Sequence, residues 1–242
     1  MTTFCMKLAG IPMQVQAIFS ETKVFCKAYL TEEPPAFSLS MEKADIDRER
    51  EKSRAEDERE GIPVRHFSDA YLETLALYRK IAVALLDYGV VLFHGAVVAM
   101  GDTAFLFTAK SGTGKTTHTN LWLKQYPEAF IVNGDKPLLK VTESGVMACG
   151  TPWQGKEDLG KNAEVPLKAI CILERDTTNH IRKITMKEAL PMLLQQAYRP
   201  QSEEAMGKTL ERLGQIGQNV EFYRLGCNLE QEAAVVAYEG MK

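Results

Sequence analysis

The first forty residues alternate between short apolar runs and prolines. FCMKLAG, MQVQAIF, KVFCKAYL and AFSLSM are runs of strand length, and Pro12, Pro34 and Pro35 interrupt them. Short apolar or alternating runs bounded by turn residues are typical of β-strands. The pattern predicts a small N-terminal sheet. Residues 42–60, which are almost all charged, predict a solvated helix or a loop, with a regulatory or partner-binding arm as the alternative.

From Phe67 onward the apolar residues recur at helical spacing. They are Phe67, Tyr71, Leu75, Tyr78, Ala82 and Leu85. This periodicity predicts an amphipathic helix. Ser68 can accept a backbone N–H bond as its N-cap, and Gly89 marks its expected end.

The remainder mixes strand and helix patterns. VVLFHGAVVAM and TAFLFTA are joined by Gly101-Asp102, which predicts a hairpin. Further strands are expected in AFIVNGD, KPLLKV, GVMACG, VPLKAICILER and VEFYRLGC, and helices over 114–126, 186–196, 202–217 and LEQEAAVVAYEG. Strand-to-strand hairpins among helices predict an α/β fold with a mixed sheet and flanking helices. We expect residues 1–60 to form the small β-rich lobe with a charged connector, and 61–242 to form the second domain.

Composition narrows the function classes. The 242 residues are 45% hydrophobic and 25% charged, with a formal net charge of −3, which favours neither nucleic acid nor an anionic membrane as partner. The five cysteines are far apart and odd in number, which is typical of reduced thiols in a cytoplasmic protein. We expect no signal peptide, and no membrane span in the apolar window 81–100, which Asp87, Gly89 and His94 interrupt.

The clearest chemical signal is FLFTAKSGTGKTTHTNLW, residues 105–122, which predicts a strand, a glycine loop and a helix. The loop fits the phosphate-binding pattern, with Ala109 at its first glycine position. Its glycines let backbone N–H groups converge on phosphate oxygens, and the helix N-terminus adds partial positive charge. The predicted nucleotide-binding residues are Ser111, Gly112, Thr113, Gly114, Lys115, Thr116 and Thr117. The alternative is a glycine-rich turn that caps an ordinary helix.

Four residues outside the loop are candidates for the same site. Asp135 ends the strand FIVNGD, where phosphoryl-transfer folds place a metal ligand or a base, although Asn-Gly-Asp is also ordinary turn chemistry. His94, in VVLFHGAVV, is either a core histidine or a site residue. Trp153 and Lys156, in GTPWQGKEDLGKN, could stack on a substrate and hold an anion. An ordinary surface loop is the alternative for that segment.

These elements together resemble the catalytic domain of HPr kinase/phosphorylase, within the phosphoenolpyruvate carboxykinase-like group, and are most similar to its small stand-alone members. HGAVVAMGDTAFLFTAKSGTGKTTHTNLW and AFIVNGDKPLLK carry the resemblance, which covers roughly residues 88–175. It implies ATP and Mg²⁺ as cofactors, Lys115 on the donor phosphates, Thr116 and Asp135 on the metal, and His94 at the active site. The family's acidic pair reads Gly134-Asp135 here, so its first acid is missing.

The sequence therefore predicts a phosphotransferase, an ATP- and Mg²⁺-dependent kinase whose catalytic domain spans 61–242. His94, Lys115 and Asp135 are the predicted catalytic residues. The acceptor is expected to be a hydroxyl of a small molecule or a peptide serine. The alternative is a non-catalytic nucleotide-binding regulatory or scaffold protein, which the missing acid and Ala109 favour. The sequence does not predict an oligomeric state.

Overall fold

A computed structural model describes residues 1–242. Backbone contacts divide the chain into two units, Met1–Ala84 and Leu85–Lys242. The expected division at residues 60 and 61 differs from this boundary because the charged helix 43–60 packs against the helix that follows it. The expected division of the chain into two domains, 1–60 and 61–242, stays a prediction.

The N-terminal unit contains a three-stranded sheet of order β1-β2-β3, formed by β1 (Thr2–Leu8), β2 (Ile11–Ala17) and β3 (Phe37–Ser40). β1 and β2 pair antiparallel, while β2 and β3 pair parallel. The small β-rich sheet predicted from the alternating runs is therefore present.

One of those runs is helical instead. KVFCKAYL falls in α1 (Ser20–Phe25) and the 3-10 helix η1 (Lys27–Tyr29), so the predicted strand is wrong. The buried carboxylate of Glu73 accepts hydrogen bonds from the backbone nitrogens of Ile18 and Phe19, at 2.6 and 3.2 Å, and from the hydroxyl of Thr22. This long-range contact satisfies backbone donors at the start of α1, which local sequence cannot reveal.

The charged stretch forms α2 (Lys43–Glu60), and the amphipathic segment forms α3 (Asp69–Ala84). Glu42 and Asp45 form a capping box at the start of α2. Asp45 also pairs with Lys80 of α3 at 2.6 Å. Ser68 caps α3 as predicted, because its hydroxyl accepts the N–H of Tyr71 at 3.2 Å.

The second unit is built on a nine-stranded mixed sheet, with the main order β4-β8-β9-β10-β6-β5-β7. Its strands are β4 (Val90–Leu92), β5 (Ala96–Met100), β6 (Thr103–Thr108), β7 (Phe130–Asn133), β8 (Leu138–Thr142), β9 (Gly145–Cys149), β10 (Glu164–Arg175), β11 (His180–Ile184) and β12 (Glu221–Cys227). β10 pairs parallel with β6 and β12, and antiparallel with β9. The predicted hairpin β5–β6 is present, with Met100 opposite Thr103.

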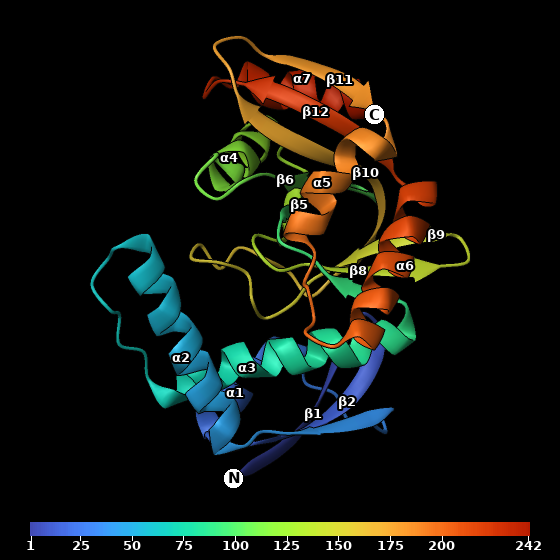
Figure 1. The fold of residues 1–242 in the computed structure, drawn as a ribbon. Helices are drawn as coiled ribbons and strands as arrows, with labels where there is room; N and C mark the ends of the chain where they lie inside the picture. Colours follow the sequence, from blue (N-terminus) through green and yellow to red (C-terminus); the bar gives the residue numbers. More distant parts are fainter. The chain divides into compact units, whose positions relative to one another are not determined.

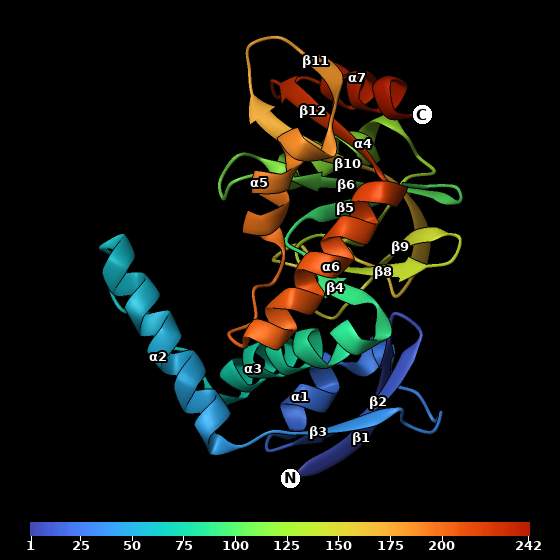
Figure 2. The same cartoon turned by 45° about the vertical axis from the view of Figure 1, so that its right-hand side comes forward.

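Helices cover both faces of the sheet (Figures 1 and 2). They are η2 (Leu85–Tyr88), α4 (Lys115–Gln125), α5 (Met186–Gln196), α6 (Glu203–Asn219) and α7 (Glu232–Met241). Along β6, Leu106 packs into the core with α5 and α6, whereas Phe105 and Phe107 pack into the core with α4 and α7. Because successive strand residues point to opposite faces, a strand covered on both sides is apolar throughout.

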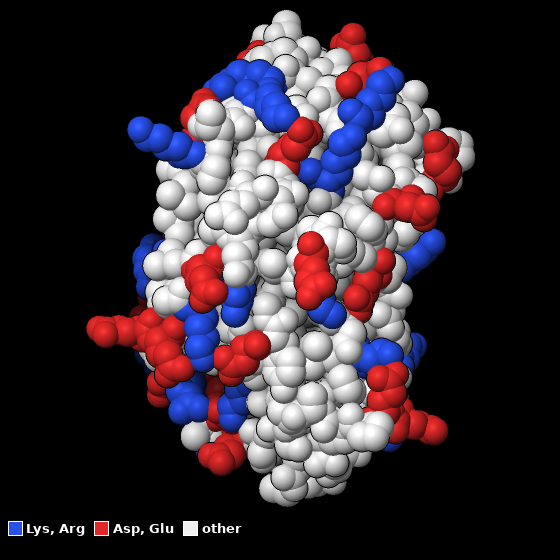
Figure 3. Space-filling view, turned by 90° about the vertical axis from the view of Figure 1, so that its right-hand side faces the viewer, with Lys and Arg blue, Asp and Glu red and all other residues white.

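The fold brings the ends of neighbouring strands together around the glycine loop. The loop follows β6, and β10 and β12 run parallel to β6, so the C-terminal ends of these three strands lie at one edge. Ligands of open α/β sheets bind at such edges. Lys and Arg are interspersed with Asp and Glu on the face in Figure 3. No helix combines the length and apolar character that a membrane crossing requires.

Candidate functional site

The glycine loop, residues 109–114, connects β6 to α4. Gly112 and Gly114 have φ of 75° and 121°, a region that residues with a Cβ rarely adopt. Arg175, at the end of β10, donates from Nη2 to the carbonyl of Gly112 and from Nε to the carbonyl of Thr113 at 3.3 Å. The Thr113 carbonyl and the Gly114 N–H belong to one trans peptide group, in which the C=O and the N–H point in opposite directions. Because the carbonyl faces Arg175, the Gly114 N–H points away from it.

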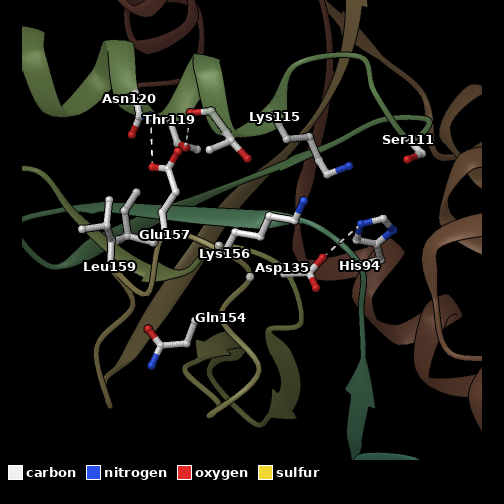
Figure 4. A pocket seen from close by; sticks show the side chains of 14 residues that line it. His94, Ser111, Lys115, Thr119, Asn120, Asp135, Gln154, Lys156, Glu157 and Leu159 are labelled. Carbon is white, nitrogen blue, oxygen red and sulfur yellow. Dashed lines mark hydrogen bonds and ion pairs between the residues drawn. The ribbon is translucent and has the colours of Figure 1, made fainter. Parts of the chain in front are cut away.

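A first cavity of about 440 Å³ lies beside this loop. Six predicted site residues line it: His94, Ser111, Lys115, Thr116, Asp135 and Lys156. In Figure 4 the side chains of Lys115 and Lys156 reach into the same part of the cavity, and the carboxylate of Asp135 faces His94. The structure thus brings together side chains from the β4–β5 connection, the glycine loop, α4, the end of β7 and the segment before β10.

Asp135 is presented by a turn that its neighbour Asn133 holds. The buried Asn133 side chain accepts the backbone N–H groups of Asp135 and Lys136 at 2.9 and 2.7 Å. Its amide nitrogen donates to the hydroxyl of Thr151 at 2.9 Å. Asn133, Gly134 and Asp135 therefore form a turn, and that turn holds the Asp135 carboxylate at the cavity. Sequence reasoning did not identify Asn133, although a buried Asx side chain before a turn is a known signal.

The Asp135 carboxylate is held by cationic and hydrogen-bonding neighbours. Its Oδ1 lies 3.2 Å from His94 Nε2 and 3.1 Å from Lys136 Nζ. Burial alone would raise the pKa of Asp135, but the His94 hydrogen bond and the charge of Lys136 outweigh it and lower the pKa to about 2. Burial lowers the pKa of Lys115, with Asp135 acting in the opposite sense. Asp135 is therefore an anion at neutral pH, set between cations.

His94 lies between β4 and β5 rather than inside a continuous strand. Its backbone N–H donates to the carbonyl of Gln196 at 2.8 Å, and its carbonyl accepts the Thr108 hydroxyl at 3.0 Å. The next residue, Gly95, donates its N–H to the Asp135 carbonyl at 3.0 Å. These backbone bonds fix the position of the His94 imidazole relative to the end of β6 and to Asp135.

Gly134 stands where the resemblance noted from the sequence would have an acid, and the structure leaves no room for a side chain there. A Cβ there would lie 2.6 Å from the backbone carbonyl oxygen of Gln154. That contact distance is far below van der Waals separation, and a backbone atom cannot rotate away. The segment that contains Gln154, Lys156 and Glu157 thus fills the space into which a side chain at 134 would project.

This segment brings a second carboxylate to the cavity, that of Glu157. Its Oε2 accepts a hydrogen bond from Asn120 Nδ2 of α4 at 3.1 Å (Figure 4). Neither residue was predicted, because a contact between residues 37 positions apart leaves no local signal.

The remaining predicted residues lie elsewhere. Gly112, Thr113, Gly114 and Thr117 line a second cavity on the Arg175 side of the loop. Trp153 is only 8% exposed and is not on the wall of either cavity. Its side chain is buried rather than presented by an exposed loop, and its role as a substrate contact stays a prediction.

The residues present fit a phosphate-bound magnesium ion better than an all-protein metal site. No group of three or more His, Cys, Asp and Glu side chains in the chain could hold a metal ion. Mg²⁺ is usually bound by one or two carboxylates together with substrate phosphates and water. Thr116 and Asp135 line one cavity, and the interactions of Asp135 engage Oδ1 alone. Its Oδ2 is available as a ligand.

Comparisons with known proteins give a distant structural likeness. No protein-family model matches the sequence, and no curated protein sequence matches it. A solved structure of the Hpr(Ser) kinase/phosphatase from Coxiella burnetii aligns with 52% of this chain and 92% of its own, at 12% identity and a TM-score of 0.30. A superposition at that score is too loose to transfer a fold, a site or an activity.

Proposed function

We propose that this protein is a kinase that uses ATP and Mg²⁺ to phosphorylate a hydroxyl group of a small molecule or a peptide serine. The observation that carries the proposal is the first cavity. It gathers Lys115, Thr116, Asp135 and His94 beside a glycine loop at the start of a helix. These residue types are the ones that phosphoryl transfer uses for charge neutralisation, metal binding and positioning.

In this proposal the loop and Lys115 bind the donor phosphates. The first N–H groups of α4 have no partner within the helix, and the helix dipole favours an anion at that end. Lys115 adds a full positive charge from the same turn. Mg²⁺, held by Thr116 and Asp135 Oδ2, would supply further charge neutralisation. Lys156 also lines the cavity and contributes a second ammonium group to the transferred phosphate.

The acceptor hydroxyl approaches from the His94 side. Its oxygen forms a bond to the γ-phosphorus while the bond from that phosphorus to the β,γ-bridging oxygen breaks, and the electron pair stays on ADP. His94 Nε2 faces Asp135, so Nδ1 of a neutral ring is the nitrogen that can take the hydroxyl proton. Asp135, with its pKa near 2, orients the ring and is too weak a base for this step.

A transfer assay tests this proposal. Wild type would be incubated with γ-labelled ATP, Mg²⁺ and panels of hydroxyl-bearing metabolites and serine peptides, beside Asp135→Asn and the control Asp102→Asn in the β5–β6 turn. We expect a labelled phosphoester whose rate of formation falls about a hundredfold or more in Asp135→Asn and is unchanged in the control. Binding of Mg·ATP without transfer to any acceptor would favour the regulatory or scaffold alternative.

A further inference from the structure

The first cavity has a second part, on the side away from His94. In Figure 4 the residues proposed for phosphoryl transfer occupy one side of the cavity: His94, Asp135 and the ends of the Lys115 and Lys156 side chains. Asn120, Glu157 and Leu159 occupy the other side. Asn120 lies on the second turn of α4, and the other two lie in the segment between β9 and β10. We refer to these three residues as the Glu157 side.

The Glu157 side holds a carboxylate that has no cationic partner. Oε2 of Glu157 accepts a hydrogen bond from Asn120 Nδ2 at 3.1 Å, and the structure records no other hydrogen bond or ion pair for this side chain. The other carboxylate of the cavity, Asp135, contacts both His94 and Lys136. The cationic groups of the site therefore balance one carboxylate and leave the charge of the other uncompensated.

The oxygen atoms that remain free at this pair are hydrogen-bond acceptors. The Asn120 amide turns Nδ2 toward the carboxylate, so its Oδ1 faces away and has no recorded partner. Glu157 keeps Oε1. A ligand group that satisfies both oxygens must be a donor, and an ammonium group supplies three N–H donors together with the charge that Glu157 lacks. A hydroxyl would supply one donor and no charge.

Apolar side chains border the same side of the cavity. Leu159 is 48% exposed and lines the cavity, as does Ile131 of β7. A single exposed leucine is ordinary on a protein surface, but Leu159 lies on a cavity wall beside Glu157 and offers apolar surface to a bound molecule. A cation on a short hydrocarbon stem matches both features, because the stem covers apolar surface while the charged end reaches the carboxylate.

The volume of the cavity limits the size of that molecule. It measures about 440 Å³, near the lower end of the range for small-molecule sites, and the transferred phosphate takes a share of this space. An acceptor with its hydroxyl at His94 and its stem along the wall formed by Gly155 and Lys156 reaches Glu157 within the same cavity. The space favours a short linear molecule over a segment of a peptide.

We propose that the phosphate acceptor is a small amino alcohol, whose ammonium group binds Glu157 Oε1 and Asn120 Oδ1 while its hydrocarbon stem lies against Leu159. Its hydroxyl lies at His94. This assignment rests on the proposed kinase function and names the substrate class of that site. Glu157 and Asn120 determine specificity, because they contact the end of the acceptor that does not react and so change its affinity more than the chemistry at phosphorus.

Matched acceptors test this assignment. Phosphate transfer from Mg·ATP would be measured for linear amino alcohols of increasing chain length, each beside the neutral diol of the same length. The proteins would be wild type, Glu157→Gln, which keeps an acceptor for Asn120 and removes the charge, and the control Asp158→Asn. Asp158 is exposed and is not on the cavity wall. We expect wild type to prefer the best amino alcohol over its diol about tenfold in kcat/KM. That preference should fall about three- to tenfold in Glu157→Gln, through KM, and match wild type in Asp158→Asn.

Binding measured without transfer separates this assignment from the kinase proposal. Each amino alcohol would be titrated by ligand-observed NMR into the same three proteins with Mg·ADP present, and we expect weaker binding in Glu157→Gln and, because salt screens ion pairs, at high salt. Equal transfer to amino alcohols and diols by wild type, or a preference for lysine-containing serine peptides, would overturn the amino alcohol assignment alone. Binding that depends on Glu157 with no transfer to any acceptor would overturn the kinase proposal alone. Neither binding nor transfer would overturn both.

Discussion

Replacement of Gly134 by alanine tests whether the Gln154 segment excludes a side chain at this position. Gly134 is not among the residues with positive φ, so alanine meets no backbone penalty there. Its Cβ would meet the Gln154 carbonyl oxygen at 2.6 Å, and that oxygen belongs to backbone. Overpacking of this kind costs about 1–3 kcal/mol, which for a protein of this length lowers the melting temperature by about 2–4 °C per kcal/mol.

Gly207 provides the matched control. It lies inside α6, and a Cβ there meets no atom within 4 Å. Gly207→Ala should raise stability by up to about 1 kcal/mol, because alanine is the better helix former. Both variants would be measured by urea denaturation and differential scanning calorimetry. A Gly134→Ala protein as stable as wild type would refute the claim that the Gln154 segment excludes a side chain at this position.

Three further predictions concern the loop and two titrating groups. Arg175→Met, which removes two hydrogen bonds to loop carbonyls, should weaken Mg·ATP binding roughly tenfold by calorimetry; unchanged affinity would contradict the anchoring role. The pKa of Asp135 is lowered to about 2, so the contribution of this carboxylate to stability is present above pH 4 and is lost as pH falls toward 2. The free energies of unfolding of wild type and Asp135→Asn, measured by urea denaturation, should therefore converge over that range. Burial lowers the pKa of His118 to about 4, so protonation of this ring favours the unfolded state. The free energy of unfolding of wild type should fall by on the order of 3 kcal/mol between pH 6.5 and pH 4. That of His118→Phe should depend less on pH over the same range.

Features specified by short stretches of sequence were predictable. The β5–β6 hairpin follows from a two-residue Gly-Asp connection between apolar runs, and the break from strand to helix at 109–114 follows from its glycines. The mixed sheet followed from the number of such hairpins. Six of the predicted site residues meet in one cavity, because the ends of neighbouring strands share one edge of a sheet.

Features specified by distant contacts were not predictable. The start of the helix α1 is held by Glu73, which lies more than fifty positions away and accepts the backbone N–H groups of the two residues just before the helix. The anchoring of the glycine loop by Arg175 spans a separation of 63 residues. The burial of Trp153 was missed because a polar, glycine-rich context is typical of exposed loops. Each of these outcomes depends on packing that local propensity does not encode.

Binding of a phosphate donor by the glycine loop is the central claim, and one titration tests it most directly. Mg·ATP would be titrated calorimetrically into wild type, Lys115→Ala and the control Lys124→Ala, whose lysine lies in the last turn of the same helix. We predict micromolar affinity in wild type and in Lys124→Ala, and its loss in Lys115→Ala. No heat from wild type with ATP, GTP or pyrophosphate, or an unchanged affinity in Lys115→Ala, would contradict the claim.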